Sequence, residues 1–346
     1  MKNVIIADYI GNSSRDGTVS GHLQKVLNDL NYLLKDTFDL QYVVCSNYVE
    51  GLDDCNVIGQ LERISIHSSK FREILQRKRN ISKILQSGKT IWFVNIDFWF
   101  FLFLIFSNTR GKEIFITNYL DYSKGSTFKR VLYKLASKKI RSEFTTIKDT
   151  WMPNQSFIPD YWYDEEQYEV FCEGGKKEQV VICGAISRAK DINGVIGAFK
   201  QNNYPLMIKG RFETDELFNN CINAVNGASN IQIDNKRLSD AEYYSLIGES
   251  KYVLLPYRKE NYSGRSSGVM LESVFMDSIV IAPRFLLDEL GISGYGYDKI
   301  SDLIGFDDDT LSSKRIKEIL AANGKIKELY SKKEIKKVYV RRLCGD

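Results

Sequence analysis

The segment Ser263–Pro283 combines a loop of small residues with one acidic residue on the helix expected to follow it. An apolar run, Lys251–Pro256, precedes it, and the pattern predicts strand, loop, helix and strand in turn. In a parallel sheet this order places a helix N-terminus at the carboxyl end of a strand, where backbone N–H groups can hold a phosphate. Glu272, near the start of the helix, could accept hydrogen bonds from hydroxyl groups. Alternatively, the small residues only permit tight packing and Glu272 is a solvated helix carboxylate.

The elements that must position these residues alternate along the whole chain. Short apolar strands separated by helices predict an α/β protein with parallel sheets covered on both faces. The first half has predicted strands at Val4–Ala7, Leu40–Val44, Ile91–Ile96, Ile114–Thr117 and Glu143–Thr146, and predicted helices at Ser20–Leu34, Ser68–Leu85, Phe98–Phe106 and Thr127–Ser137. The second half has predicted strands at Gln179–Cys183, Pro205–Lys209, Asn230–Ile233, Lys251–Leu255 and Ser278–Ala282, and predicted helices at Asp191–Lys200, Glu213–Asn226, Ser239–Gly248 and Ser267–Asp277.

We therefore expect two doubly wound, Rossmann-like domains that face a ligand-binding cleft. A chain of 346 residues is long enough for two such domains. The predicted boundaries are residues 1–158 and 165–329, with a C-terminal helix at about 330–346 that could pack back on the first domain. Pro153–Pro159 and Glu173–Glu178 interrupt the alternation and are predicted to form the hinge region.

Composition excludes several classes of protein. The net charge of +4 is small and argues against a dedicated nucleic-acid binder. Six scattered cysteines and two histidines favour reduced thiols and give a zinc site few ligands. The chain begins directly with a strand rather than a signal-peptide pattern, so we expect a cytoplasmic protein. Asp307–Asp309 is interpreted as a helix N-terminus rather than a metal site.

Two segments raise the question of a peripheral membrane contact. Ile91–Phe106 is the most apolar stretch, but it is shorter than a membrane span and is interrupted by Asn95 and Asp97. It is predicted to be a buried strand and helix, with a lipid-contacting aromatic surface as the alternative. The basic run Lys325–Arg342 is predicted to be a solvated terminal helix, with attraction to an anionic leaflet as the alternative.

The second half resembles the GT-B-fold glycosyltransferases of the large retaining family 4 group. Its successive motifs follow the order of that family from about Gln179 to Leu290, whereas the first half is similar only in layout. The motifs are VVICGAISRAKDINGVIGAF, LMIKGRF, NIQIDNKRLSDAEYYSLIGESKYVLLPYR and SGRSSGVMLESVFMDSIVIAP.

The resemblance implies a diphosphate site after the first strand of the second domain. Gly184 and Lys190 match the family's Gly and the Lys that holds the diphosphate of the donor, and an ammonium there would neutralise the leaving group. Where the family tends to carry an Arg, this chain has Ala185. We favour Arg265 as the substitute cation because an Arg in the loop of small residues could grip phosphate with two hydrogen bonds. The candidates for the second charge are Arg188, Lys209, Arg211 and Arg265, and each could instead be a solvated loop charge.

The resemblance also assigns roles around the helix of Glu272. Glu272 matches the second Glu of the family's pair, which contacts the ribose of the nucleotide, whereas Gly264 stands in place of the first. Tyr257 could line the same pocket or pack against the hinge. The transferred sugar would then be contacted by the loop and helix start, Ser266, Ser267, Gly268 and Val269.

In the first domain, the loop GNSSRDGTVSGH and the segment FITNYLDYSKG match family regions that border the donor and the acceptor. Gly17 and Thr18 are the candidates in the loop. Asn118 and Asp121 are the candidates in the second segment, where a carboxylate could orient or deprotonate an acceptor hydroxyl. Alternatively, Asp121 caps the following turn.

The function implied is a metal-independent, retaining glycosyltransferase that needs no cofactor. It would transfer a sugar from a nucleotide-sugar donor to a glycan or lipid-linked acceptor, in the cytoplasm or at the inner face of the cytoplasmic membrane, in bacterial surface polysaccharide synthesis. Two alternatives remain. The same scaffold could be a sugar-nucleotide epimerase, or, given Ala185 and Gly264, a degenerate protein that binds without catalysis.

Overall fold

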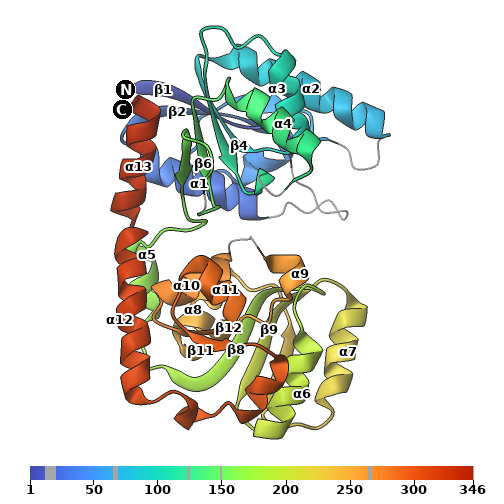
Figure 1. Ribbon diagram of the computed structural model, residues 1–346, viewed down its shortest axis with the longest axis vertical. Coiled ribbons are helices and arrows are strands. Elements are labelled where there is room, and N and C mark those ends of the chain that lie inside the picture. Colours follow the sequence, from blue (N-terminus) through green and yellow to red (C-terminus); the bar gives the residue numbers. More distant parts are fainter. Residues whose placement is uncertain (12–20, 65–68, 123–124, 149, 264–266, 346) are drawn as a thin grey trace. The chain divides into compact units, whose positions relative to one another are not determined.

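The computed structural model describes residues 1–11, 21–64, 69–122, 125–148, 150–263 and 267–345 (Figure 1). Contacts divide the chain into two compact units, Met1–Ile158 with Ile335–Asp346, and Pro159–Glu334. The predicted hinge Pro153–Pro159 is wrong in part, because Gln155–Phe157 is a strand of the first sheet. Its residues alternate too briefly to give a strand signal in the sequence.

The first unit is built on a seven-stranded parallel sheet with the order β3-β2-β1-β4-β5-β6-β7. The order reverses between β1 and β4, as in doubly wound folds. The strands are β1 (Lys2–Asp8), β2 (Phe38–Cys45), β3 (Val57–Leu61), β4 (Thr90–Asn95), β5 (Glu113–Asn118), β6 (Ser142–Thr145) and β7 (Gln155–Phe157).

Helices pack on both faces of this sheet because neighbouring residues of β4 point in opposite directions. The ring of Phe93 lies 4.8 Å from that of Phe100 in α3, whereas Trp92 lies 5.0 Å from Tyr339 in α13. On one face, α3 contacts both α2 and α4 (Figure 1). The helices of the unit are α1 (Gly21–Leu34), the short 3-10 helix η1 (Ser46–Gly51), α2 (Lys70–Ser87), α3 (Phe98–Phe106), α4 (Thr127–Ser137) and most of α13 (Lys332–Cys344).

The second unit repeats the design with a six-stranded parallel sheet, β10-β9-β8-β11-β12-β13, whose order reverses between β8 and β11. The strands are β8 (Lys177–Ile186), β9 (Leu206–Phe212), β10 (Ile231–Asn235), β11 (Ser250–Leu254), β12 (Ile279–Pro283) and β13 (Tyr295–Tyr297). Its helices are α5 (Glu165–Tyr168), η3 (Glu169–Phe171), α6 (Ile192–Asn202), α7 (Asp215–Val225), α8 (Asp240–Gly248), α9 (Lys259–Tyr262), α10 (Gly268–Phe275), α11 (Arg284–Leu290), η4 (Ile300–Gly305), η5 (Asp308–Thr310) and α12 (Ser313–Leu329).

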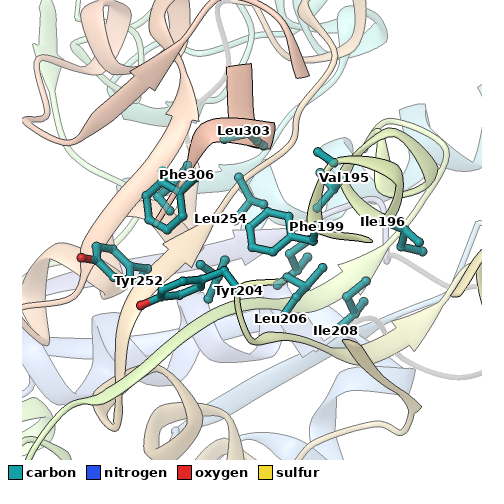
Figure 2. Packing of buried hydrophobic residues seen from close by; sticks show 14 of the residues in the cluster. Val195, Ile196, Phe199, Tyr204, Leu206, Ile208, Tyr252, Leu254, Leu303 and Phe306 are labelled. Carbon is teal, nitrogen blue, oxygen red and sulfur yellow. The ribbon is translucent and has the colours of Figure 1, made fainter. Parts of the chain in front are cut away.

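A continuous apolar core lies between this sheet and α6 (Figure 2). Phe199 from α6 and Phe306 pack over Leu206, Ile208 and Leu254 of the strands (Figure 2). The rings of Tyr252 and Phe306 meet edge to face with centroids 5.1 Å apart. Such pairs add to the free energy gained from buried area, so they stabilise the sheet that carries the loops at its carboxyl edge.

The C-terminal basic run is not one solvated helix. It spans α12 and α13, and α13 buries Ile335, Tyr339 and Leu343, spaced four residues apart, in the first unit. Tyr339 packs against Trp92 and Phe144. Within the described ranges, no helix combines enough length with enough apolar character to span a bilayer.

Candidate functional site

The carboxyl edge of β8 and β11 is the point where the strand order of the second sheet reverses. Ligands of doubly wound folds bind outside such a point, because the neighbouring loops diverge there. Here the two loops are joined by backbone hydrogen bonds, from Asp191 N to the Pro256 carbonyl at 2.8 Å and from Arg258 N to the Ala189 carbonyl at 2.9 Å. The bonds hold Lys190 in a fixed position next to Tyr257, with which it forms a β-bridge.

Lys190 is a buried cation. The residue is 5% exposed, its Nζ donates to the Cys183 carbonyl at 3.2 Å, and it lies 5.4 Å from the centre of the Tyr257 ring. Among the described residues, no carboxylate forms an ion pair with Lys190. Burial lowers the pKa of its ammonium to about 8. Because a buried charge without a counter-ion is costly, this position favours an anionic ligand.

The N-terminus of α10 lies beside the end of β8. Gly184 has a left-handed backbone with φ of 81°, and a Cβ built there would lie 3.7 Å from Val269 in the first turn of α10. Ser267 caps the helix by accepting from Met270 N, and its Oγ lies 3.5 Å from the Tyr257 hydroxyl. The predicted residues Gly184, Lys190, Tyr257, Ser267 and Val269 are therefore close together.

Gly268 permits another aromatic side chain to reach this helix start. A Cβ at Gly268 would lie 2.0 Å from the Tyr161 ring, a distance that real contacts do not reach. Tyr161 was missed in the sequence, because the contact joins segments that are distant along the chain. Only glycine allows this ring to lie against the first turn of α10.

Glu272 is buried rather than a solvated helix carboxylate, with 4% of its surface exposed. Its carboxylate accepts from the hydroxyls of Tyr243 at 2.6 Å and Tyr244 at 3.3 Å, both from α8. Burial raises the pKa of the Cys183 thiol to about 12, with Lys190 lowering it and Glu272 raising it. Lys190 donates to the carbonyl of Cys183, and the next residue, Gly184, lies against the first turn of α10, so Lys190 and the helix of Glu272 meet at the end of β8.

Three of the other predicted cations are paired with other residues or cannot be placed. The Arg188 side chain is 70% exposed and pairs with Glu216 at 3.0 Å. Lys209, opposite Cys183 in the strand register, pairs with Asp234 at 3.5 Å. Arg265 and Ser266, together with Gly264, lie outside the described residues, so the second cation stays a prediction.

The predicted residues of the first unit are only partly placed. Gly17 and Thr18 lie outside the described residues. Asn118 is buried, donates to Glu143 at 2.8 Å and accepts from Leu120 N at 3.0 Å, so its amide holds the end of β5 in place. Asp121 is half-buried just beyond that strand, and its contact with an acceptor stays a prediction.

Two acidic residues at the strand-order reversal of the first sheet were not predicted. Asp8 ends β1, is fully buried, and accepts from Ile10 N, Gly11 N and the Asn95 amide at 3.1, 3.0 and 3.2 Å. Burial raises its pKa to about 6. Asp97 follows β4 and accepts from the Tyr9 hydroxyl at 2.6 Å and Arg77 at 2.9 Å. A carboxylate directly after a buried strand was the sequence signal for both.

Replacing Asp8 with Asn should change how stability depends on pH. Because the folded pKa is raised from 3.8 to about 6, the stabilisation is present below pH 3.8 and is lost as pH rises through about 6. The variant lacks this loss, so its free energy of unfolding relative to wild type should rise by about 2.5 kcal/mol from pH 4 to pH 7. Urea unfolding followed by tryptophan fluorescence measures this, with exposed Asp36→Asn as control. If the difference in free energy of unfolding between Asp8→Asn and wild type were the same at pH 4 and pH 7, the assignment of a raised pKa to Asp8 would be contradicted.

Acidic, cysteine and histidine side chains do not cluster in the described part of the chain as a metal ion would require. In the segment Asp307–Asp309, Asp307 is the N-cap of η5, where its backbone N–H donates to Thr310 Oγ1 at 2.8 Å.

Comparison with known proteins shows likeness at the level of structure. No protein-family model and no curated protein sequence match the chain. A glycosyltransferase from Rickettsia africae has a TM-score of 0.71 at 14% identity, over 100% of this chain and 99% of that one. Anabaena HepE in complex with UDP and glucose has a TM-score of 0.68 at 12% identity, over 99% of this chain and 100% of that one. UDP-GlcNAc 2-epimerase from Neisseria meningitidis bound to UDP-GlcNAc has a TM-score of 0.61 at 11% identity, over 100% of both chains.

These likenesses extend over almost the full length of each chain, so they cover both sheets and not a single doubly wound unit. Together with the two parallel sheets of matching topology, they confirm the predicted α/β architecture. The chain has the GT-B fold.

Proposed function

We propose that the protein is a glycosyltransferase that uses a nucleotide-sugar donor. One observation carries the proposal: a buried ammonium, Lys190, lies without a carboxylate partner among the described residues at the strand-order reversal of the second sheet. The diphosphate of a nucleotide sugar would supply the missing negative charge. The fold shared with a Rickettsia glycosyltransferase and with HepE supports the same assignment.

The proposed chemistry follows from this placement. When the bond between the sugar and the diphosphate breaks, negative charge builds on the departing nucleoside diphosphate. Lys190 and the N–H groups at the start of α10 would stabilise this charge, because fixed donors in a water-poor site need no reorganisation. Glu272, held by Tyr243 and Tyr244, would accept hydrogen bonds from the ribose.

The finer assignments rest on the resemblance in sequence. We propose retention of anomeric configuration, catalysis without a metal, and a glycan or lipid-linked acceptor oriented by Asp121. Transfer would take place in the cytoplasm or at the inner face of the cytoplasmic membrane, during synthesis of a bacterial surface polysaccharide.

Incubation of the whole protein with a panel of nucleotide sugars tests the proposal. A glycosyltransferase should leave the sugar part of its donor unchanged when no acceptor is present, and should release the nucleoside diphosphate when an extract containing glycan or lipid-linked acceptors is added. Thermal-shift measurements with nucleoside diphosphates would identify the base, because a ligand of the folded state raises apparent stability. If no nucleotide binds, the proposal fails and a non-catalytic role is favoured.

A sugar-nucleotide epimerase is the second candidate, because the Neisseria epimerase has the same fold. An epimerase would convert its nucleotide sugar in the absence of acceptor. Conversion of one member of the panel to its epimer, followed by chromatography or NMR, would therefore favour this function over transfer.

The affinity for nucleoside diphosphate should depend on pH through Lys190. Its pKa in the free protein is lowered to about 8, and a bound diphosphate would raise it, so binding takes up a proton above pH 8. Affinity should be constant below this pH and then fall by up to about tenfold per pH unit. Calorimetry between pH 7.5 and 9.5, in buffers of different ionisation enthalpy, measures the affinity and the proton uptake.

Lys190→Arg provides the control for this pH dependence, because guanidinium stays protonated over the whole range. Its affinity, whatever its absolute value, should change little between pH 7.5 and 9.5. A wild-type affinity that is equally independent of pH, with no proton uptake, would show that Lys190 does not contact the diphosphate.

A further inference from the structure

Large apolar side chains are exposed on three neighbouring helices of the first unit, α2, α3 and α4. Phe71 is 69% exposed, Phe106 is 81% exposed and Phe128 is 65% exposed. Each of the three helices contributes one of these phenylalanines. Further exposed apolar residues of these helices and of the loop before α4 are Leu75, Leu120, Val131 and Leu135.

The outer face of α4 carries two parallel rows of residues. Phe128, Val131 and Leu135 are spaced three and four apart and form an exposed apolar row, since such spacing places residues on one side of a helix. Arg130, Lys134 and Lys138, spaced four apart, form an exposed basic row beside it. Lys134 also lies 5.6 Å from the centre of the Trp151 ring. This apolar-and-basic face is solvent-exposed, whereas the opposite side of α4 is buried.

The outer face of α2 repeats this arrangement. Phe71 and Leu75 are exposed on it, next to the exposed cations Arg72, Arg79 and Lys83. The only acidic residue of α2 is Glu73, which pairs with Arg77 at 3.6 Å. α3 and α4 contain no acidic residue. The three helices together are therefore strongly basic, although the whole chain has a net charge of only +4.

Side-chain contacts join α4 to α3 along this surface. The rings of Phe98 in α3 and Phe128 in α4 lie 6.1 Å apart, and Lys129 lies over Phe98 at 5.8 Å. Lys139 donates to the carbonyls of Leu104, Ile105 and Ser107 at the end of α3.

Between α2 and α3 the surface contains a cavity of about 750 Å³. Apolar side chains, including Leu85, Leu102 and Phe106, line it together with Lys78 and Lys112. It thus offers apolar walls and positive charge in the same place. A lipid with an anionic head group has the complementary features, an apolar chain and a negative charge.

We propose that this surface, formed by the outer faces of α2, α3 and α4, docks on a bilayer that contains anionic lipid. The exposed aromatic and aliphatic side chains would enter the boundary between head groups and acyl chains, and the basic rows would contact the anionic head groups. Charge complementarity decides between occupants, because in a symmetric dimer the same basic face would meet itself and repel. The proposal does not depend on glycosyl transfer, and it assigns the lipid contact to these helices rather than to α13, whose apolar row of Ile335, Tyr339 and Leu343 is buried.

Flotation of the full chain with vesicles tests the proposal. The protein should float with vesicles of equal parts phosphatidylglycerol and phosphatidylcholine, and should remain unbound with phosphatidylcholine alone. Binding to the anionic vesicles should weaken as salt is raised, because exposed charges are screened.

Two sets of variants and two matched controls locate the surface. Removing three cations of the basic faces should weaken binding about 100-fold, and removing three exposed apolar residues should weaken it about tenfold. The basic set is Arg130→Gln, Lys134→Gln and Lys138→Gln, and its control is Lys314→Gln, Lys317→Gln and Lys325→Gln on α12. The apolar set is Phe106→Ser, Phe128→Ser and Leu135→Ser, and its control is Ile222→Ser, Ile304→Ser and Leu329→Ser. The controls remove equal numbers of exposed residues from the second unit and should bind as wild type does.

Circular dichroism and sedimentation velocity accompany the flotation. Folded variants of both sets that float as well as wild type would overturn the proposal, as would equal binding of wild type to neutral and anionic vesicles. A wild-type dimer that the apolar set converts to monomer would overturn it too, because the surface would then be an interface between copies.

Discussion

Lys190→Met should weaken the binding of nucleoside diphosphates about 100-fold or more, because it removes a desolvated charge aimed at an anion. The same substitution should stabilise the free protein. Because burial lowers the folded pKa of Lys190 from 10.5 to about 8, stability falls as pH drops from 10.5 to 8, and the cost of the buried charge is fully present at neutral pH. Met removes that cost but also the hydrogen bond to Cys183, so the net gain should be roughly 1 to 3 kcal/mol.

Opposite effects on binding and stability distinguish a ligand-binding lysine from a structural one. Calorimetry measures the loss of affinity, and urea unfolding at pH 7 measures the gain in stability. Lys200→Met is the matched control, since Lys200 also donates to a backbone carbonyl, of Ala224 at 3.0 Å, but is exposed. It should change neither quantity by much. If Lys190→Met lowered stability and left affinity unchanged, Lys190 would be a structural residue.

Gly210→Ala should destabilise the second unit and disturb the site at the same time. Gly210 lies opposite Gly184 in the register of β9 and β8, and a Cβ at Gly210 would lie 2.0 Å from the Gly184 carbonyl oxygen. That oxygen belongs to the backbone, so the two strands must separate. We expect the free energy of unfolding to fall by roughly 3 kcal/mol. Affinity for the diphosphate should also fall. Gly184 lies in β8 and Lys190 lies in the loop after it, so both would move with the displaced strand.

Gly197→Ala is the matched control, and we expect it to change the free energy of unfolding in the opposite direction. Gly197 is exposed within α6, and a Cβ there meets no atom within 4 Å. Alanine favours the helix over glycine, so stability should rise by about 0.5 to 1 kcal/mol. Urea unfolding of both variants under one set of conditions makes the comparison. A Gly210→Ala protein as stable as Gly197→Ala would mean that β8 and β9 do not approach so closely.

Long, strongly patterned elements could be predicted from the sequence. The expected bounds of Phe98–Phe106 and Thr127–Ser137 agree with α3 and α4, and the helix expected at Ser239–Gly248 agrees with α8, for which Ser239 is the N-cap. β3 and β13 were missed because they are short edge strands whose residues are only partly buried. Their apolar signal is therefore weak.

Only those parts of the candidate site that follow from residue type and from position along the chain could be predicted. Lys190 and Glu272 follow strands whose carboxyl ends must meet in a parallel sheet, so their proximity could be expected. The two tyrosines of α8 that hold Glu272, and the burial of Asp8, depend on how helices pack against the sheet. Side-chain contacts of that kind leave no spacing pattern in the sequence.

A crystal structure of the whole protein with the nucleoside diphosphate that gives the largest thermal shift tests the central claim most directly. We expect the diphosphate within hydrogen-bonding distance of Lys190 Nζ and of the first N–H groups of α10, with the ribose hydroxyls at Glu272. A diphosphate bound away from Lys190, or a nucleotide in contact with the first sheet alone, would contradict the account.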